Sequence, residues 1–379
     1  MSAAAACMPQ LVPPSSPLHG SAAQQQPAMA AAERRQPGAT ETAKIDCHGI
    51  EEQRAEDNSD GVSAVGKPRP VVRTLTCERK AYMEGFALWR SIGRPELQEL
   101  DPILSFDEFE SGRYEFHLHL SLSLVFSVSA PAGFTDHPHR GFENVTYMLE
   151  GSVSYHDFSG HKGTINTGDV QWLTAGRGVV HAEVPGGHGV QRGINIWINL
   201  SASNKMVEPR YQDLASDAIP VATTDEGGVS VKVIAGECLG VRSPLRPRTP
   251  ALCLDVTLRP GACLRQPVPR GWTACAYVID GEAHFGGEGG AKSSAGARTL
   301  VVFGDGDGDV VDVCAEASGA RVMVVAARPH GEAVVRDGPF VMNTREEVEQ
   351  AREDFRHRRN GFEMANGWTS DHAVAATAR

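Results

Sequence analysis

The chain has 379 residues, of which 41% are hydrophobic, 22% are charged and only 6% are aromatic. It carries 36 Lys and Arg against 47 Asp and Glu, so its formal net charge is −11. An acidic chain is a poor phosphate binder, and no apolar run reaches the about 20 residues that cross a bilayer. We therefore expect neither direct nucleic-acid binding nor a membrane span.

The first 73 residues are unlike a folded domain. Residues 1–73 contain no Phe, Trp or Tyr and are rich in Ala, Pro, Ser, Gln and Gly. Such a segment buries too little apolar surface to offset its chain entropy, so we predict a disordered tail. The absence of acidic residues before Glu33 leaves an organellar transit peptide as the alternative, although the first Arg, Arg34, comes late for one.

The 8 cysteines are spread along the chain without a Cys-x-x-Cys pair. This spacing fits neither a zinc finger nor a compact disulfide framework, and a chain of this length folds without disulfides. The first ten residues also lack the charged and apolar regions of a secretory signal. We expect a reducing, intracellular environment.

From Tyr82 onward, short β-branched or alternating runs recur, each punctuated by Gly, Pro, Asp or Asn. The runs cover residues 144–149, 151–155, 193–200, 229–234, 252–258, 273–279, 300–303 and 321–325. Many short strands with closely spaced turns predict an all-β barrel or sandwich rather than βαβ units. One helix is predicted from Asn343 to Arg356, because Asn343 and Thr344 can cap it and acidic residues follow.

The sequence also repeats itself. Aligning Gly151 with Gly281 places residues 140–142 (RGF) on residues 270–272 (RGW) without a gap. Two copies of one β-barrel unit explain this pattern. The two copies differ in chemistry, because one carries metal-binding side chains where the other has none: His137, His139 and Glu143 align with Pro267, Pro269 and Thr273.

Four residues with metal-binding side chains occur as two closely spaced pairs. His137 and His139 are separated by one residue, and so are His181 and Glu183. Side chains at i and i+2 of a strand face the same side, so two such pairs on neighbouring strands would direct three imidazoles and one carboxylate to one point. Imidazole suits Fe, Ni, Cu and Zn, and an added carboxylate is typical of non-haem Fe(II) sites. We predict a metal site at these four residues.

Other residues compete with this assignment or could support it. Glu143 follows the His-x-His pair and is the rival fourth ligand, although we favour Glu183. A second pair, His117 and His119, has no Gly or Pro turn and no partner motif, so we assign it no function. Two further side chains are candidates for orienting ligands or substrate: Arg140 and Gln171.

At these motifs the chain resembles the pirin family. The resemblance runs from about residue 71 to about residue 372. It rests on five blocks: residues 90–97 (RSIGRPEL), 136–143 (DHPHRGFE), 171–183 (QWLTAGRGVVHAE), 205–212 (KMVEPRYQ) and 338–344 (GPFVMNT).

The resemblance implies an all-β bicupin, with two jelly-roll-like cupin barrels packed together, a short C-terminal helix and a disordered N-terminal tail. We divide the chain into a tail (1–73), a metal-binding cupin (74–240), a cupin without metal ligands (241–345) and a helix with its tail (346–379). In pirins only the N-terminal barrel holds iron. The resemblance assigns Fe²⁺ to residues His137, His139, His181 and Glu183, with Ni, Mn, Co or Cu as alternatives.

The resemblance implies two functions. One is a quercetin 2,3-dioxygenase, an oxidoreductase that cleaves a flavonol with O₂ and releases CO, with the same four residues as catalytic site. The other is an iron-dependent, redox-sensing nuclear cofactor that binds transcription regulators or signalling proteins. We lean towards the enzyme and keep a metal-free structural bicupin as a third reading. We expect a monomer in nucleus and cytoplasm.

One segment departs from the family pattern. Residues at about 111–127 form an insert. In family members, the stretch that matches Phe106 is followed almost directly by the one that matches Pro131. Their alternating Leu and Ser composition is alien to the surroundings. We hypothesise a retained intron or gene-model error, with a lid over the metal site as the alternative.

Overall fold

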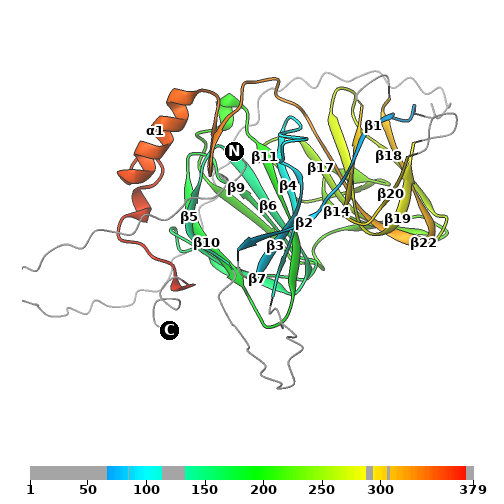
Figure 1. Ribbon diagram of the computed structural model, residues 1–379, viewed down its shortest axis with the longest axis horizontal. Coiled ribbons are helices and arrows are strands. Elements are labelled where there is room, and N and C mark those ends of the chain that lie inside the picture. The colour runs from blue at the N-terminus through cyan, green and yellow to red at the C-terminus, as the bar shows by residue number, and fades with distance from the viewer. Residues whose placement is uncertain (1–65, 84, 113–132, 287–292, 305–307, 373–379) are drawn as a thin grey trace, which may run out of the picture. The chain divides into compact units, whose positions relative to one another are not determined.

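A computed structural model describes residues 66–83, 85–112, 133–286, 293–304 and 308–372. These residues form two β-barrels that lie side by side, with one short helix beside the first barrel (Figure 1). The all-β architecture predicted from the sequence is therefore confirmed. Residues 1–65 of the predicted tail, most of the insert at 111–127, and the second His-x-His pair lie outside the described residues.

The first barrel consists of two antiparallel sheets. The seven-stranded sheet has the order β12 (Arg210–Leu214), β9 (Val170–Thr174), β6 (Phe142–Glu150), β11 (Gln191–Asn199), β4 (Ile103–Ser111), β3 (Phe86–Ile92) and β2 (Arg79–Met83). The four-stranded sheet has the order β5 (Phe134–His139), β10 (Val179–Pro185), β7 (Ser152–Asp157) and β8 (Lys162–Asn166). The strand β5 carries the His-x-His pair, and among the described strands it pairs only with β10, so it lies at an edge of this sheet.

The second barrel is one nine-stranded sheet that curls on itself. Its main path has the order β1 (Val71–Thr76), β21 (Thr299–Phe303), β19 (Thr273–Phe285), β22 (Val310–Ala327), β17 (Ala251–Leu258), β14 (Val229–Ala235) and β13 (Val221–Thr223). Two short strands lie off this path: β18 (Cys263–Pro267) pairs with β22, and β20 (Ser293–Gly296) pairs with β19.

Sheet membership corrects two expectations drawn from chain order. Residues 71–73, predicted as tail, belong to β1, and β1 pairs with β21 of the second barrel. The predicted boundary at residue 240 assigns β13 and β14 to the first domain. Both strands instead pair within the sheet of the second barrel. Backbone hydrogen bonds between distant strands decide membership, and local sequence patterns do not report them.

The C-terminal segment crosses back to the first barrel. It contains a hairpin, the predicted helix and a 3-10 turn: β23 (Val335–Asp337), β24 (Phe340–Met342), α1 (Arg345–Arg356) and η2 (Glu363–Ala365). Three short elements lie earlier in the chain: η1 (Ala202–Asn204), β15 (Glu237–Cys238) and β16 (Val241–Arg242). Thr344 and Glu347 form a capping box at the start of α1, as the sequence predicts. No helix among the described residues is long and apolar enough to cross a bilayer.

A glycine lets this segment pack closely. Gly141 has a φ of +90°, and a Cβ there would lie 1.9 Å from the carbonyl oxygen of Val341. Only Gly tolerates both that conformation and that approach. The C-terminal hairpin is therefore fixed directly beside the strand that carries His139.

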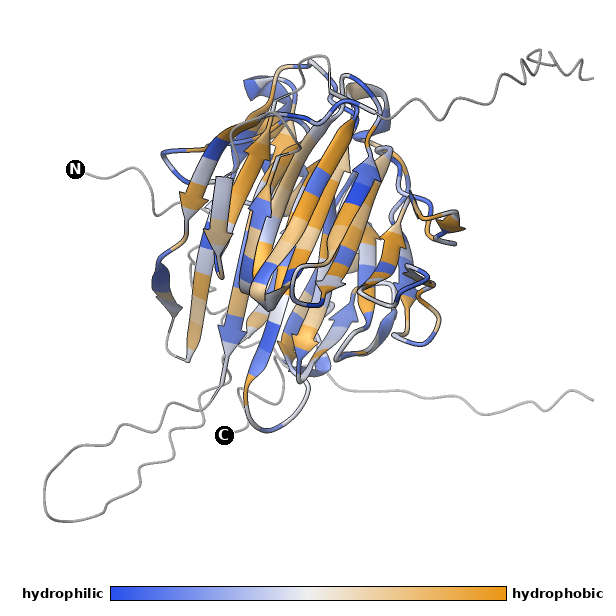
Figure 2. Cartoon of the chain, turned by 90° about the vertical axis from the view of Figure 1, so that its right-hand side faces the viewer, coloured by the Kyte–Doolittle hydropathy of each residue, from blue (hydrophilic) through white to orange (hydrophobic). Residues whose placement is uncertain are grey.

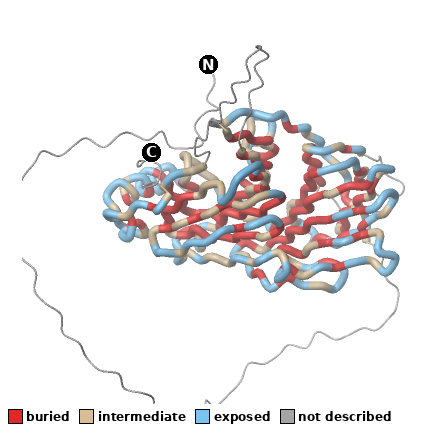
Figure 3. Tube along the Cα trace, turned by 90° about the horizontal axis from the view of Figure 1, so that it is seen from below, coloured by how far each residue is buried: buried red, intermediate tan, exposed pale blue. Residues whose placement is uncertain are grey.

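Hydrophobic residues concentrate in the strands, where hydrophilic residues interrupt them (Figure 2). Buried residues concentrate along the strands and exposed ones in the loops (Figure 3). One cluster of buried apolar residues spans both barrels, with Trp172 and Ile194 from the first and Ile234 and Met323 from the second. The two barrels therefore share a core between their facing sheets.

The interface between the barrels is nearly symmetric. Tyr147 of the first barrel donates to Asp255 of the second at 2.6 Å, and Tyr277 of the second donates to Glu108 of the first at 2.9 Å. The repeat alignment places Tyr147 on Tyr277. Each carboxylate is also paired with an arginine of its own barrel: Arg321 with Asp255 and Arg192 with Glu108.

Candidate metal centre

Two antiparallel strands of the first barrel position the candidate ligands. In the pairing of β5 with β10, His137 lies opposite His181. His139 follows His137 by two residues and projects to the same side, while Pro138 points away. An edge strand tolerates Pro138 because one side of it has no ladder to supply with hydrogen bonds.

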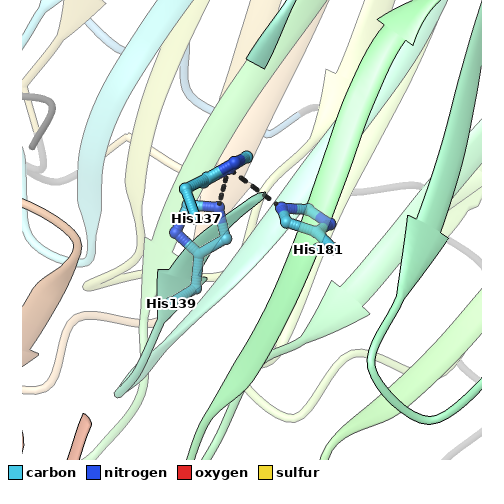
Figure 4. Close-up of side chains that lie close together, drawn as sticks. All are labelled: His137, His139 and His181. Atoms are coloured by element: carbon cyan, nitrogen blue, oxygen red, sulfur yellow. Dashed lines mark hydrogen bonds between the residues drawn. The ribbon is translucent and has the colours of Figure 1, made fainter. Parts of the chain in front are cut away.

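The three imidazoles converge on one point (Figure 4). The Nε2 atom of His137 lies 3.0 Å from Nε2 of His139 and 3.1 Å from Nε2 of His181. Two nitrogen ligands at right angles on a metal about 2.1 Å away are separated by about 3.0 Å. The donor atoms therefore have the spacing that a first-row metal ion requires.

Burial keeps these imidazoles neutral. Burial lowers the pKa of His137 to about 4 and lowers the pKa values of His139 and His181 well below their usual range. Neutral imidazole is the form that binds a metal. His137 Nδ1 lies 2.8 Å from the carbonyl oxygen of Thr135, a contact that places its proton on Nδ1 and leaves the Nε2 lone pair for a ligand.

Glu183 stands beside the three histidines. Its Oε2 lies 3.7 Å from Nε2 of His181, and its Oε1 accepts a long hydrogen bond of 3.5 Å from the Thr146 hydroxyl. A register shift in the β5–β10 pairing falls between His181 and Glu183. Burial raises the pKa of Glu183 to about 7, so without a metal this carboxyl holds a proton below neutral pH.

The rival ligand Glu143 is committed elsewhere. Its carboxylate accepts hydrogen bonds of 2.9 to 3.0 Å from two side chains of β9 and two backbone N–H groups of the segment leading to β17: Trp172, Thr174, Arg248 and Thr249. This buried carboxylate thus joins the two barrels. The geometry favours Glu183 over Glu143 as a fourth ligand.

Arg140 does not orient the histidines, which corrects the sequence-based suggestion. Its guanidinium pairs with Asp354 of α1 at 3.0 Å, donates to the carbonyl oxygens of Arg177 and Asn360 and lies over the ring of Phe362. Arg140 therefore anchors the C-terminal helix. Gln171 is buried on β9, opposite Thr146 of β6. The hydroxyl of Thr146 in turn contacts Glu183.

A cavity opens onto two of the histidines, His137 and His139. Its apolar wall includes side chains of the barrel interior: Phe86, Leu88, Phe109, Phe134, Val153 and Trp197. Its polar lining includes Arg90, Asp107, Asn144, Thr146, Gln191, Asn195 and Arg336 as well as Glu183. The cavity therefore suits a flat, largely apolar ligand with a few polar groups.

The sequence analysis did not identify these lining residues as part of a site. Arg90 belongs to the RSIGRPEL block, and it forms a bidentate pair with Asp107 at 2.8 and 2.9 Å. Arg336 precedes the GPFVMNT block and stacks on Trp197, with 4.5 Å from its guanidinium carbon to the ring centre. The place of Arg90 in a family block, and of Arg336 two residues before another, was the signal that could have marked them.

Comparisons with known proteins identify the family. Two family profiles match the chain: Pirin over residues 85–198 and Pirin C-terminal cupin domain over residues 253–361. A pirin-like protein of Solanum lycopersicum is 47% identical over 309 residues, covering 81% of this chain and 98% of that protein. The chain belongs to the pirin family.

Two further relatives agree with this assignment. Pirin of Homo sapiens is 44% identical over 308 residues, covering 81% of this chain and 99% of that protein. Among solved structures, quercetin 2,3-dioxygenase from Acinetobacter baumannii matches with a TM-score of 0.66 and 28% identity, covering 77% of this chain and 98% of that one. The resemblance to pirins noted from the sequence, and the two-cupin fold it implies, are confirmed.

The second barrel of this pirin family member offers no equivalent site. Pro267 of β18 lies opposite Val310 of β22, where the first barrel pairs His137 with His181. In the described part of the chain, His137, His139 and His181 are the one cluster of three or more metal-binding side chains. A metal at this centre would therefore belong to the first barrel.

Proposed function

We propose that this chain is a quercetin 2,3-dioxygenase that cleaves a flavonol with O₂ and releases CO, using Fe²⁺ bound by His137, His139, His181 and Glu183. The observation that carries the proposal is the convergence of three buried, neutral imidazoles at the end of an aromatic-lined cavity. The relative from Acinetobacter baumannii, named as a quercetin 2,3-dioxygenase, supports the choice of substrate.

The donor set fits iron(II). Imidazole nitrogens with one carboxylate suit a non-haem iron that keeps positions open for other ligands. When bound, the iron would act as a Lewis acid towards the substrate hydroxyl and supply one-electron chemistry towards O₂. Ni, Mn, Co and Cu remain alternatives, because nitrogen ligands bind several divalent metals.

The chain's own residues would then bind the flavonol and move one proton. Phe86, Phe109 and Phe134 line the wall against which the flavonol rings pack. Glu183, which is ionised when a cation is bound, would take the proton of the flavonol 3-hydroxyl as a general base. Thr146 holds the other carboxylate oxygen and so keeps Glu183 aimed at the cavity.

The test is a reaction with purified, iron-loaded protein. Incubation with quercetin should consume the flavonol absorbance and release one CO per flavonol. His139→Ala should lose both signals, whereas His284→Ala, on the second barrel, should keep them. Confirmed iron occupancy with neither CO nor flavonol loss would refute the proposal.

A second candidate is a redox-sensing cofactor that binds transcription regulators or signalling proteins in the nucleus and the cytoplasm. The net charge of −11 favours partner proteins with basic surfaces over nucleic acid. Oxidation of Fe²⁺ to Fe³⁺ would add one charge inside a poorly solvated site, which could change the affinity for a partner. Pull-downs with the reduced and the oxidised protein test this idea, and identical partners and affinities in both states would remove it.

A further inference from the structure

The second barrel carries a disulfide that the spacing of the cysteines did not predict. Cys263 of β18 and Cys314 of β22 are bonded, and they lie 51 positions apart in the sequence. They lie directly opposite each other in the β18–β22 ladder, with their Cα atoms 4.0 Å apart. The bond therefore joins two neighbouring strands side to side.

This disulfide lies on the outer face of the barrel. Leu264, next to Cys263, is buried, and so are Val313 and Ala315 on either side of Cys314. Because side chains alternate along a strand, both cysteines face outwards. Cys263 is exposed and Cys314 is half-buried, since Cys314 lies between Cys263 and His284 of β19 in the same cross-strand row.

The remaining cysteines in the described part of the chain are chemically different. Cys77, Cys238, Cys253 and Cys275 are buried and unbonded, and burial raises the pKa of each thiol. A buried thiol of raised pKa reacts slowly, because the thiolate is the reactive form. A reagent in solvent therefore reaches the sulfur atoms of Cys263 and Cys314 before those of the other described cysteines.

The strand that the disulfide holds also anchors the start of the described chain. Strand β18 pairs only with β22 among the described strands. From β18, the guanidinium of Arg265 donates to the carbonyl oxygen of Gly66. In the loop after β18, the carbonyl oxygens of Pro269 and Trp272 accept hydrogen bonds of 2.7 and 2.5 Å from Arg69. Backbone hydrogen bonds to Asp309 and Val310 also hold residues 67 and 69, so loosening β18 would weaken one part of the anchoring of residues 66–69.

We propose that Cys263 and Cys314 form a reversible thiol–disulfide site that exchanges with dithiols and with low-molecular-weight disulfides, and that its oxidation state sets how firmly β18 and residues 66–69 are held. The site lies in the barrel without metal ligands and acts independently of the chemistry proposed for the first barrel.

The exchange is a two-electron reaction. A thiolate of the dithiol attacks the exposed Cys263 sulfur, the Cys263–Cys314 bond breaks, and Cys314 leaves as a thiolate that takes a proton from solvent. The second thiol of the reductant attacks the mixed disulfide, which releases Cys263 as a thiol and the reductant as its own disulfide. In the reverse direction, two cysteine thiols and one glutathione disulfide give the protein disulfide and two molecules of glutathione.

Differential alkylation of the full-length protein tests the site. The folded protein is equilibrated with glutathione disulfide, then treated with dithiothreitol, alkylated and mapped by peptide mass spectrometry, which separates the two cysteines from Cys7 and Cys47. We expect Cys263 and Cys314 to become alkylated only after dithiothreitol, while the four buried cysteines stay unlabelled. Return to glutathione disulfide should restore the bond.

Hydrogen exchange measured on the same samples tests whether the oxidation state changes how firmly β18 and residues 66–69 are held. Reduction should speed amide exchange about tenfold at residues 263–267 and 66–69, because one local constraint on opening is removed. Exchange at residues 134–139 of the first barrel should stay unchanged. Cys263→Ser should exchange like the reduced protein whether or not oxidant is present, whereas Ser294→Ala, at the far end of the same cross-strand row, should respond like the parent.

Three results would overturn the proposal. They are a disulfide that resists dithiothreitol until the protein unfolds, two thiols that glutathione disulfide does not join, and unchanged exchange at residues 263–267 after complete reduction.

Discussion

The two barrels share one fold but have different interiors. The second barrel is filled by apolar side chains, among them Leu264, Val311 and Phe285. At the corresponding place the first barrel has a cavity lined by His137 and His139, with His181 buried beside them. Since Tyr147 and Tyr277 make matching contacts across the interface, the scaffold itself is nearly symmetric.

The comparison teaches that function here depends on a few substitutions in a shared scaffold. At the positions aligned with His137 and His139 the second barrel has Pro267, where the β18–β22 ladder ends, and Pro269, so it lacks two of the donors. One copy thus fills its interior with apolar side chains, and the other carries a cavity and polar groups. Each prediction below asks whether the barrels differ in the way that this division requires.

The largest expected effect is the loss of one imidazole. His181→Ala removes a donor from the centre of the cluster, and we expect metal affinity to fall by at least about 100-fold, with loss of any metal-dependent activity. Titration with Fe²⁺ under anaerobic conditions measures the change. His284→Ala on the second barrel is the matched control and should bind metal like the parent. Equal affinities of parent and His181→Ala would contradict the assignment of the site.

Metal removal should affect the two barrels unequally. A metal that binds only the folded first barrel stabilises it by about 2.7 kcal/mol at a free concentration of 100 times Kd. Chelation should therefore speed amide exchange in β5 and β10 while β18 and β22 keep their rates. Equal acceleration in both barrels would show that the metal stabilises the molecule as a whole.

The symmetric tyrosines should contribute equally. Tyr147→Phe and Tyr277→Phe each leave a buried carboxylate with one hydrogen bond fewer, which we expect to cost about 1–3 kcal/mol of stability in either case. Urea unfolding of both variants measures the free energies. Values that differ by more than the measurement error would show that the interface is symmetric in geometry but not in energy.

Proton release on metal binding should depend on Glu183. Without metal its raised pKa of about 7 keeps it protonated below neutral pH, and a bound cation requires the ionised form. Binding should thus release roughly one proton at pH 6 and roughly a tenth of a proton at pH 8. The histidines are already neutral in this range because their pKa values are lowered. Calorimetry in buffers of different ionisation enthalpy measures the release, and Glu183→Gln should abolish it. Release that is the same at both pH values would rule out Glu183 as the source.

The smallest expected effect concerns Thr146. Thr146→Val removes the hydroxyl that contacts Glu183 but keeps the shape of the side chain, and the contact is long at 3.5 Å. We expect metal affinity to fall by no more than about tenfold, the low end for residues that orient ligands. Thr146→Ser should restore it. A larger loss with Ser than with Val would mean that packing, not the hydroxyl, supports Glu183.

Local pattern was enough to predict much of the fold and the candidate site. The i, i+2 spacing of His137 and His139 fixes a shared side only on a strand, and the strand pairing places His181 opposite His137. The cap of α1 is likewise local, because Asn343, Thr344 and the acidic residues after them predict the helix, and Thr344 and Glu347 form its capping box.

Features that depend on contacts between residues far apart in the chain could not be predicted from the sequence. The crossing of β1 to the second barrel depends on its ladder with β21, more than 200 residues later. The role of Arg140 depends on Asp354 of α1. The disulfide depends on the register of β18 against β22, which the separate positions of Cys263 and Cys314 do not reveal. Such pairings need the three-dimensional arrangement of the strands.

The most direct measurement is a crystal structure of the iron-loaded protein with anomalous data collected at the iron edge. A single iron peak about 2.1 Å from the Nε2 atoms of His137, His139 and His181, with Glu183 turned towards it, is the predicted result. A peak elsewhere, or none at these histidines in protein shown to contain stoichiometric iron, would contradict the account.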